Sequence, residues 1–394
     1  MVKMTQMVPM ISGVGASAEV GKRMKEFGCT KILLVHGKEI EGLGLAEKIA
    51  GYLLAEGLEV VDFNKVVSDP SDKYIDENVQ FVRDSGVDGA VAVGGGSAMD
   101  TAKALLGLAT REGTSIRDHM FHRTSAQWLN NNGYHLICIP TTSGTGSEAS
   151  EAAVVTDTAM QFKSSFKYPA DLAILDPEMT VSMPKHLTAE TAMDAMAHAT
   201  ESYVHAAASP KNFALNGWAI KTITKYLPIV TENPDDLEAR GKLQAAAAFA
   251  AMGFNDAGLN MGHGIAHNLG VVYHIPHGVG CALTVPEMII HYASAVPERV
   301  REIGEYMGMS FEENEAPLSV ANKIACKMRE LMKVSGVRDF RTLGYTKEQI
   351  QDVAHHTFDV QTQVPFWMNN TPGVRMNEDY LRYILGQMYD NYTM

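Results

Sequence analysis

The stretch Val87–Ser97 (VDGAVAVGGGS) decides the fold of the first half of this chain. Its small and β-branched apolar residues predict a buried strand over Val87–Val93. Glycines and a serine follow directly, and the next residues have the apolar spacing of a helix. Glycines let backbone N–H groups approach a phosphate closely, and the helix dipole favours negative charge at that end. This order of strand, glycine turn and helix predicts an anion site at the Gly94–Ser97 turn.

The same alternation extends through the first half. Further strands are predicted at Lys31–His36, Leu58–Phe63 and His135–Ile139. Apolar residues at helical spacing predict helices over Leu43–Glu56, Lys73–Ser85 and Ala98–Ala109. Strands that alternate with helices at these short connections are typical of a parallel sheet with right-handed crossovers. We therefore predict a nucleotide-binding α/β layer fold.

A second loop at a strand end strengthens the prediction of a ligand site. The strand His135–Ile139 runs into Pro140–Glu148 (PTTSGTGSE), which is rich in hydroxyl side chains and contains two glycines. Such groups suit phosphate, ribose or carboxamide at the carboxyl end of a strand, where α/β folds bind ligands. The segment Gly13–Gly15 lacks the full glycine spacing and is predicted to be only a turn. The polar segment Thr114–Asn132 is expected to be an insertion or a loop at a cleft edge.

The pattern changes in the second half of the chain. From Thr188 onward the segments are rich in Ala, Met and Leu at helical spacing, and no alternating strand pattern remains. A length of 394 residues suits two cores rather than one. Pro184 interrupts the chain within the boundary region Val181–Leu187. We therefore expect an α/β domain over residues 1–183 and an all-helical domain over residues 184–394.

Composition and charge exclude several classes of function. The formal net charge is −13, with 46% hydrophobic and 20% charged residues, and no Lys/Arg run offsets the negative charge locally. Nucleic acid and anionic membrane surfaces are therefore not expected as partners. The N-terminus lacks an export signal, and no run of about 18 apolar residues occurs. We expect a cytoplasmic protein with a small-molecule substrate.

The four cysteines are spread far apart without CxxC pairing: Cys29, Cys138, Cys281 and Cys326. This spacing is typical of reduced thiols in a reducing compartment. No histidine stands beside them in a recognisable nucleophile arrangement, so we expect no thiol catalysis.

Carboxylate and imidazole side chains at helical spacing indicate a metal site. Asp194 and His198 are four residues apart and project from one helix face. His263, His267 and His277 lie within fifteen residues, among glycines that allow close packing. One carboxylate with two or three imidazoles suits Fe²⁺, Zn²⁺, Mn²⁺ or Co²⁺ and leaves a position for a substrate oxygen. Spacing alone leaves further candidates open: Glu190 and Glu201 as carboxylates, and His205 and His274 as imidazoles.

Taken together, these stretches resemble the group III, iron-containing alcohol dehydrogenases over nearly the whole chain. The resemblance rests on the Gly94–Ser97 turn with Asp100 and Lys103, Pro140–Glu148, Asp176-Pro177, Asp194-xxx-His198, His263-xxx-His267 and His277. It implies a dinucleotide-binding α/β domain followed by an all-α metal-binding domain, the dehydroquinate synthase-like architecture. It also implies a cleft between them and a homodimer or higher homo-oligomer.

The resemblance assigns roles to individual residues. It implies Asp194, His198, His263 and His277 as ligands, with Fe²⁺ the first choice of metal and Zn²⁺, Mn²⁺ or Co²⁺ as alternatives. His267 matches a histidine that lies beside the nicotinamide rather than on the metal. The positions that match holders of NAD(P)(H) are Gly95, Gly96, Ser97, Asp100, Thr141, Thr142, Thr145 and Lys163.

The chain departs from the family pattern at two positions. Many NAD-using relatives have an aspartate that binds the adenosine ribose where this chain has Gly37. A carboxylate there would repel a 2′-phosphate, so its absence leads us to expect that NADP(H) is accepted. The side chain of Lys38 either adds attraction for the phosphate or points to solvent. Glu151 falls where relatives differ in substrate preference.

The expected activity is hydride transfer between a nicotinamide and a small primary alcohol or aldehyde, with the protein acting as an aldehyde reductase. A divalent ion would polarise the substrate oxygen as a Lewis acid, and His267 would relay the proton. One alternative is a metal-dependent lyase or cyclase of the dehydroquinate synthase type, whose anionic substrate needs a basic cluster that is not evident here. The other is a non-catalytic nucleotide sensor, which needs the loops but no metal.

Overall fold

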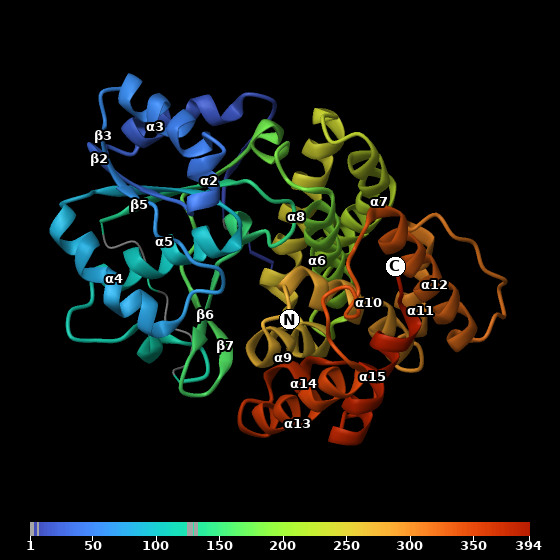
Figure 1. Cartoon of the computed structure of the whole chain (residues 1–394). Coiled ribbons are helices and arrows are strands. Elements are labelled where there is room, and N and C mark those ends of the chain that lie inside the picture. The colour runs from blue at the N-terminus through green and yellow to red at the C-terminus, as the bar shows by residue number, and fades with distance from the viewer. Residues whose placement is uncertain (1–3, 6–7, 124–128, 130–132) are drawn as a thin grey trace. The chain divides into compact units, whose positions relative to one another are not determined.

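The computed structural model describes residues 4–5, 8–123, 129 and 133–394 and divides the chain into two compact units. One unit runs from Gln6 to Met183, and the other from Pro184 to Met394 (Figure 1). Thr5 belongs to the second unit, where its N–H donates to Asp256 Oδ1 at 2.9 Å. The segment Thr114–Asn132 lies partly outside the described residues, which include a short 3₁₀ helix η2 at Ile116–His119.

A six-stranded parallel sheet forms the centre of the first unit, in the order β1-β8-β5-β4-β2-β3. Its strands are β1 (Met10–Ser12), β2 (Lys31–Val35), β3 (Glu59–Phe63), β4 (Gly89–Gly94), β5 (His135–Pro140) and β8 (Leu172–Leu175). The prediction of a parallel α/β fold is confirmed. The sequence analysis did not predict β1 and β8, the strand pair at one edge of the sheet.

Helices cover both faces of this sheet. On β2, Leu33 and Val35 pack into one core with residues of α4 and α5, whereas Ile32 and Leu34 pack into another with α1 and α3. Figure 1 shows α3 on one side of the sheet and α4 and α5 on the other. Burial on both faces explains why β2, β4 and β5 are continuous apolar runs. The elements are α1 (Val20–Glu26), α2 (Lys38–Gly42), α3 (Leu45–Ala55), α4 (Asp72–Ser85) and α5 (Gly96–Ala109), with 3₁₀ helices η1 (Ala16–Glu19), η3 (Ser147–Ala149) and η4 (Pro177–Thr180).

An antiparallel hairpin, absent from the sequence prediction, packs against α4 and α5 of the first unit. It consists of β6 (Ala152–Asp157) and β7 (Phe162–Lys167). Buried and partly exposed residues alternate along β6, as expected for a strand with one covered face. The run is short and β7 contains lysines and serines, so its period-two signal is weak.

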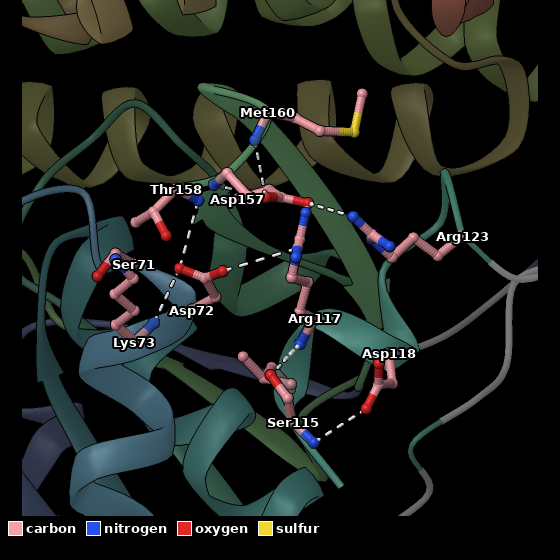
Figure 2. A network of polar contacts seen from close by, with 12 residues as sticks. Ser71, Asp72, Lys73, Ser115, Arg117, Asp118, Arg123, Asp157, Thr158 and Met160 are labelled. Atoms are coloured by element: carbon pink, nitrogen blue, oxygen red, sulfur yellow. Dashed lines mark hydrogen bonds and ion pairs between the residues drawn. The ribbon is translucent and has the colours of Figure 1, made fainter.

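Asp157 fixes this hairpin in place (Figure 2). Its Oδ1 accepts hydrogen bonds from the N–H groups of Ala159 and Met160, and its Oδ2 lies 2.8 Å from Arg117 Nε on η2. Burial opposes ionisation of Asp157, but hydrogen bonds from Arg117 and the turn outweigh it and lower the pKa to about 2. At the turn of the hairpin, Asp72 Oδ1 accepts from Thr158 N–H at 3.3 Å. The network ties the hairpin to the start of α4.

The second unit is entirely helical, as predicted. Its helices are α6 (Lys185–Val204), α7 (Pro210–Glu232), α8 (Leu237–Ala257), α9 (Met261–Tyr273), α10 (His277–Tyr292), α11 (Pro297–Tyr306), α12 (Pro317–Ser335), α13 (Lys347–Gln363), α14 (Phe366–Asn370) and α15 (Glu378–Asn391). Helix α6 is buried on nearly all sides and packs against α7, α8 and α10. Among the helices that the structure describes, none has both the length and the apolar character that a bilayer span requires.

Candidate metal centre and nucleotide-binding edge

Three neighbouring strands of the first unit end at the same edge of the sheet. Val35 of β2 pairs with Ala92 of β4, and Gly94 of β4 pairs with Pro140 of β5. The segments after these strands therefore meet there: Gly37, the Gly94–Ser97 turn and the hydroxyl-rich Pro140–Glu148 loop. This is the edge at which parallel α/β folds bind ligands.

The turn before α5 requires glycine for two different reasons. Gly94 has φ +153°, which side chains rarely adopt, and a Cβ there would lie 2.7 Å from Ala98 Cβ. A Cβ on Gly96 would lie 2.9 Å from Thr145 Cγ2, so glycine lets the hydroxyl loop pack against the first turn of the helix. Gly95, the N-cap, makes no side-chain cap hydrogen bond. The N–H groups of this helix end are thus suited to an anionic ligand.

Lys163 of β7 and Ser97 of the turn meet through Asp69. Lys163 Nζ lies 2.6 Å from Asp69 Oδ1, and Asp69 N–H donates to Ser97 Oγ at 3.2 Å. The hairpin that Asp157 anchors therefore brings Lys163 to the glycine turn, although these residues are far apart in sequence.

Asp100 and Lys103, by contrast, brace the hydroxyl loop from inside. Lys103 Nζ donates to Ser147 O (2.7 Å), Ser150 O (3.2 Å) and Ala152 O (2.8 Å). Ser147 Oγ donates to Asp100 Oδ1 at 2.7 Å. Burial raises the pKa of Asp100 to about 6 and lowers that of Lys103. These contacts give Asp100 a supporting position under the loop, and its contact with a cofactor stays a prediction.

The edge near Gly37 holds a carboxylate that the sequence analysis did not anticipate. A Cβ on Gly37 would lie 2.5 Å from Glu39 Oε1 and 2.8 Å from Oε2, so the exposed Glu39 folds back over the glycine. His36 is buried, with Nε2 2.6 Å from Asp62 Oδ1 and Nδ1 3.1 Å from the carbonyl of Gly37. Glu151, the other departure, forms an ion pair with Lys167 of β7.

In the helical unit, three helices bring the predicted metal ligands together. Asp194 lies on α6, His263 on α9 and His277 on α10. Asp194 Oδ1 lies 3.4 Å from His263 Nε2, 3.5 Å from His277 Nε2 and 3.7 Å from His198 Nε2. Asp194 and His263 are each 1% exposed, whereas the side chain of His277 is 26% exposed and forms the open side of the cluster.

These distances fit donors that share one cation. Two N/O ligands at about 2.1 Å from a tetrahedral ion are separated by about 3.4 Å. Within the described residues Asp194 Oδ1 accepts no hydrogen bond of normal geometry, although it is fully buried. Burial opposes its ionisation, but the neighbouring His198, His277 and His263 hold the pKa of Asp194 well below its usual range. An anionic oxygen surrounded by imidazole nitrogens is what a divalent transition metal requires.

The alternative carboxylates have other partners. Glu201 Oε1 lies 2.8 Å from His263 Nδ1, on the far side of that ring from Asp194. Glu190 binds Arg338 through two hydrogen bonds of 2.6 and 2.9 Å. The fold thus places Asp194 among the histidine Nε2 atoms. Sequence spacing alone could not choose between this carboxylate and those of Glu190 and Glu201.

Two further predicted residues, His198 and His267, border this cluster. The His198 ring stacks on His263, with centroids 4.5 Å apart and an interplanar angle of 18°. The His267 ring lies 5.2 Å from that of His277 and makes an edge contact with Trp367 at 5.4 Å. His205 lies at the end of α6, where its Nδ1 accepts a hydrogen bond from Ala207 N–H.

Cys281 is the residue that the sequence analysis missed. It lies one turn after His277 on α10, fully buried, and with Asp194, His263 and His277 forms a group whose donor atoms are all within 4.8 Å of one another. The premise that no histidine stands beside a cysteine is therefore wrong for Cys281, while the expectation that no thiol catalysis occurs stays a prediction. The spacing His277-xxx-Cys281 was the available signal, because residues four apart share a helix face.

Comparison with known proteins finds one family for both halves of the chain. Residues 9–177 match the iron-containing alcohol dehydrogenase family, and residues 188–377 match the C-terminal part of the Fe-containing alcohol dehydrogenase family. The NAD-dependent methanol dehydrogenase of Bacillus methanolicus is 35% identical over 90% of this chain and 92% of its own length. The 1,3-propanediol dehydrogenase of Klebsiella pneumoniae is 32% identical over 86% and 88%, respectively. The crystal structure of a 1,3-propanediol oxidoreductase matches with a TM-score of 0.89 and 29% identity over 99% of this chain and 100% of that one.

The chain belongs to the iron-containing alcohol dehydrogenase family. It is a metal-dependent oxidoreductase that acts between alcohols and aldehydes with a nicotinamide cofactor.

Proposed function

We propose that this enzyme reduces small aldehydes to primary alcohols with NAD(P)H. The observation that carries the proposal is the buried Asp194 Oδ1 with three imidazole nitrogens at 3.4–3.7 Å. Relatives named for methanol and 1,3-propanediol support a short substrate. None of the relatives named above is described as a lyase or a nucleotide sensor, so the alternatives gain no support.

Asp194, His198, His263 and His277 are proposed to hold the divalent ion, with Fe²⁺ as the first choice. When bound, the ion supplies Lewis-acid polarisation of the substrate oxygen, and the nicotinamide supplies the hydride. His267 is proposed to carry the alcohol proton between the site and solvent. An imidazole suits this step because it titrates near neutral pH, and its ring borders that of the partly exposed His277.

The glycine turn and the hydroxyl loop are proposed to hold the dinucleotide. Support comes from the uncapped start of α5, the packing of Thr145 against Gly96, and the link between Ser97 and Lys163 through Asp69. The proposed contacts are Gly37, Gly95, Gly96, Ser97, Asp100, Thr141, Thr142, Thr145 and Lys163.

NADP(H) is proposed to be accepted alongside NAD(H). Gly37 offers no fixed carboxylate to oppose a 2′-phosphate, and the Glu39 carboxylate beside it is exposed. An exposed, flexible side chain opposes a second negative charge only weakly. Glu39 therefore reduces the use of NADP(H) without excluding it.

The enzyme is proposed to work in the cytoplasm as a homodimer or higher homo-oligomer. All four cysteines are free thiols, which fits a reducing compartment. The oligomeric state follows the family resemblance, and analytical ultracentrifugation of the full chain would measure it directly.

A reduction assay tests the proposal. The full chain is reconstituted with Fe²⁺ or Zn²⁺ and assayed with NADH and NADPH against short aldehydes, with Asp194→Ala as the matched control. We expect metal-dependent oxidation of the reduced cofactor by at least one aldehyde, and none in the control. Equal rates in the wild type and the control, or no turnover with any metal, would contradict it.

A further inference from the structure

Cys281 places a sulfur atom among the proposed metal ligands. Its Sγ lies 3.6 Å from His263 Nε2 and 3.5 Å from His277 Nε2, and the side chain is fully buried. The contact is built into the fold, because His277 and Cys281 share one face of α10 while His263 comes from the adjoining α9.

The two sulfur–nitrogen distances match those of ligands on a common ion. With metal–sulfur and metal–nitrogen bonds of about 2.3 and 2.1 Å, a tetrahedral sulfur–nitrogen edge is about 3.6 Å. The Asp194 oxygen lies 3.4 and 3.5 Å from the same two nitrogens, which matches the shorter edge between nitrogen and oxygen. One centre therefore accounts for both sets of distances.

A hydrogen bond between the thiol and a histidine explains fewer of these contacts than a shared cation does. His263 Nδ1 faces the Glu201 carboxylate at 2.8 Å, which turns Nε2 toward both Cys281 Sγ and Asp194 Oδ1. One Nε2 position can form a hydrogen bond to the sulfur or to the oxygen but not to both, and Asp194 Oδ1 is a buried oxygen without a hydrogen bond of normal geometry in the described part of the chain. A cation satisfies the sulfur, both nitrogens and the oxygen together.

We propose that Cys281 Sγ is a ligand of the metal centre in the substrate-free enzyme, where it completes a four-coordinate set with Asp194, His263 and His277 in the place that the family resemblance gives to His198. It binds as a thiolate whose proton passes to solvent when the metal enters. The inference rests on the metal centre of the proposed function. Thiolate is a softer donor than imidazole or carboxylate, so Cys281 shifts the preference of this site toward Zn²⁺ and Co²⁺ and away from Fe²⁺ and Mn²⁺.

Cobalt spectroscopy on the full chain tests the proposal. Metal-free protein is titrated with Co²⁺, and the near-ultraviolet sulfur-to-cobalt charge-transfer band is recorded with cobalt stoichiometry and circular dichroism. Cys281→Ala removes the sulfur, and Cys281→Ser keeps the size of the side chain. Cys138→Ala, which removes an equally buried thiol from β5, is the matched control.

We expect the band in the wild type and in Cys138→Ala, and its loss in both Cys281 variants, which still bind cobalt. In competition between Zn²⁺ and Fe²⁺, the ratio of the two affinities should shift away from Zn²⁺ by at least about tenfold in Cys281→Ala. Replacing a residue that only supports a metal ligand already changes metal affinity by about this much. Bound cobalt without the band in the wild type, or a band that persists in Cys281→Ala, would overturn the role of Cys281 alone. A wild type that binds no divalent metal would overturn the metal centre itself.

Discussion

Glu201 Oε1 lies 2.8 Å from Nδ1 of His263, and both side chains are buried. The carboxylate fixes the orientation of the ring, so that Nε2 points at Asp194. Gly262 makes room for this contact, because a Cβ there would lie 2.3 Å from Glu201 Oε1. The second Glu201 oxygen accepts from Asn260 N–H at 2.9 Å, which holds the carboxylate at the start of α9. This carboxylate–histidine pair has the geometry of an outer-shell partner that tunes a metal ligand.

Replacing Glu201 should weaken metal binding without removing a ligand. Glu201→Gln loses the negative charge that raises the basicity of the His263 ring, and we expect metal affinity to fall about 10–100-fold. Calorimetric titration of metal-free protein with Zn²⁺ measures this. Glu190→Gln, on the same helix but bound to Arg338, should leave metal affinity unchanged. Equal losses in the two variants would mean that α6 is disturbed as a whole.

Removing a proposed ligand should abolish metal binding and activity together. We expect His263→Ala and Asp194→Ala to contain substoichiometric metal and to show no aldehyde reduction, while circular dichroism shows a folded protein. The fold survives because apolar burial across a large helical core supplies most of its stability. Metal analysis of the purified variants decides the matter, since stoichiometric metal in both would contradict the assignment.

His267 is expected to behave differently. Its ring borders that of His277, with centroids 5.2 Å apart, and makes an edge contact with Trp367 at 5.4 Å. His267→Ala should retain the metal and lose about 10- to 10⁴-fold in turnover, the range of general acid–base catalysis. Metal content and kcat are measured on the same preparation. Loss of metal would make His267 a ligand, and unchanged turnover would remove it from the proton path.

The sequence could predict features that depend on residues close together in the chain, but not those that depend on how distant segments pack. The strands β2, β4 and β5 were predictable because burial on both faces makes them continuous apolar runs, whereas the edge strand β3 is partly exposed and β1 has only three residues. Helical spacing alone paired Asp194 with His198. It could not choose among Glu190, Asp194 and Glu201, because that choice depends on how α6, α9 and α10 pack. Glu39 was missed because its place over Gly37 appears only in the folded chain. Cys281 stands one helical turn from His277, a local signal, but its contact with His263 depends on the packing of α9 against α10.

Glu148 should make stability depend on pH. Burial raises its pKa from 4.5 to about 7, and its Oε2 has no hydrogen-bond partner in the described residues. The folded state therefore binds this proton more tightly than the unfolded state, so the unfolding free energy falls as pH rises from 4.5 to 7 and then levels off.

Glu148→Gln removes this titration. We expect the variant to be more stable than the wild type above pH 7, by up to about 3 kcal/mol, with the difference vanishing near pH 4.5. Urea unfolding of metal-free protein across this range measures it, with the exposed Glu47→Gln on α3 as control. A gap that does not change with pH would show that Glu148 is not protonated in the folded state.

The last prediction concerns the choice between NAD(H) and NADP(H), which depends on two adjoining positions. The Glu39 carboxylate lies where a side chain at Gly37 would begin, so this chain replaces a fixed negative charge with a mobile one. Glu39→Gln should raise kcat/KM for NADPH relative to NADH by a few-fold, since exposed charge pairs are worth about 1 kcal/mol or less.

Gly37→Asp should act in the opposite direction. The backbone at Gly37 is extended, with φ −92°, so aspartate is tolerated once Glu39 swings away into solvent. Its shorter side chain holds the charge beside the strand end, and we expect NADPH use to fall at least about tenfold relative to NADH, or about 1.4 kcal/mol. Kinetics with both cofactors in the wild type, both single variants and the double variant measure the effect. A strict preference of the wild type for NADH that Glu39→Gln leaves unchanged would show that the adenosine ribose binds elsewhere on this edge.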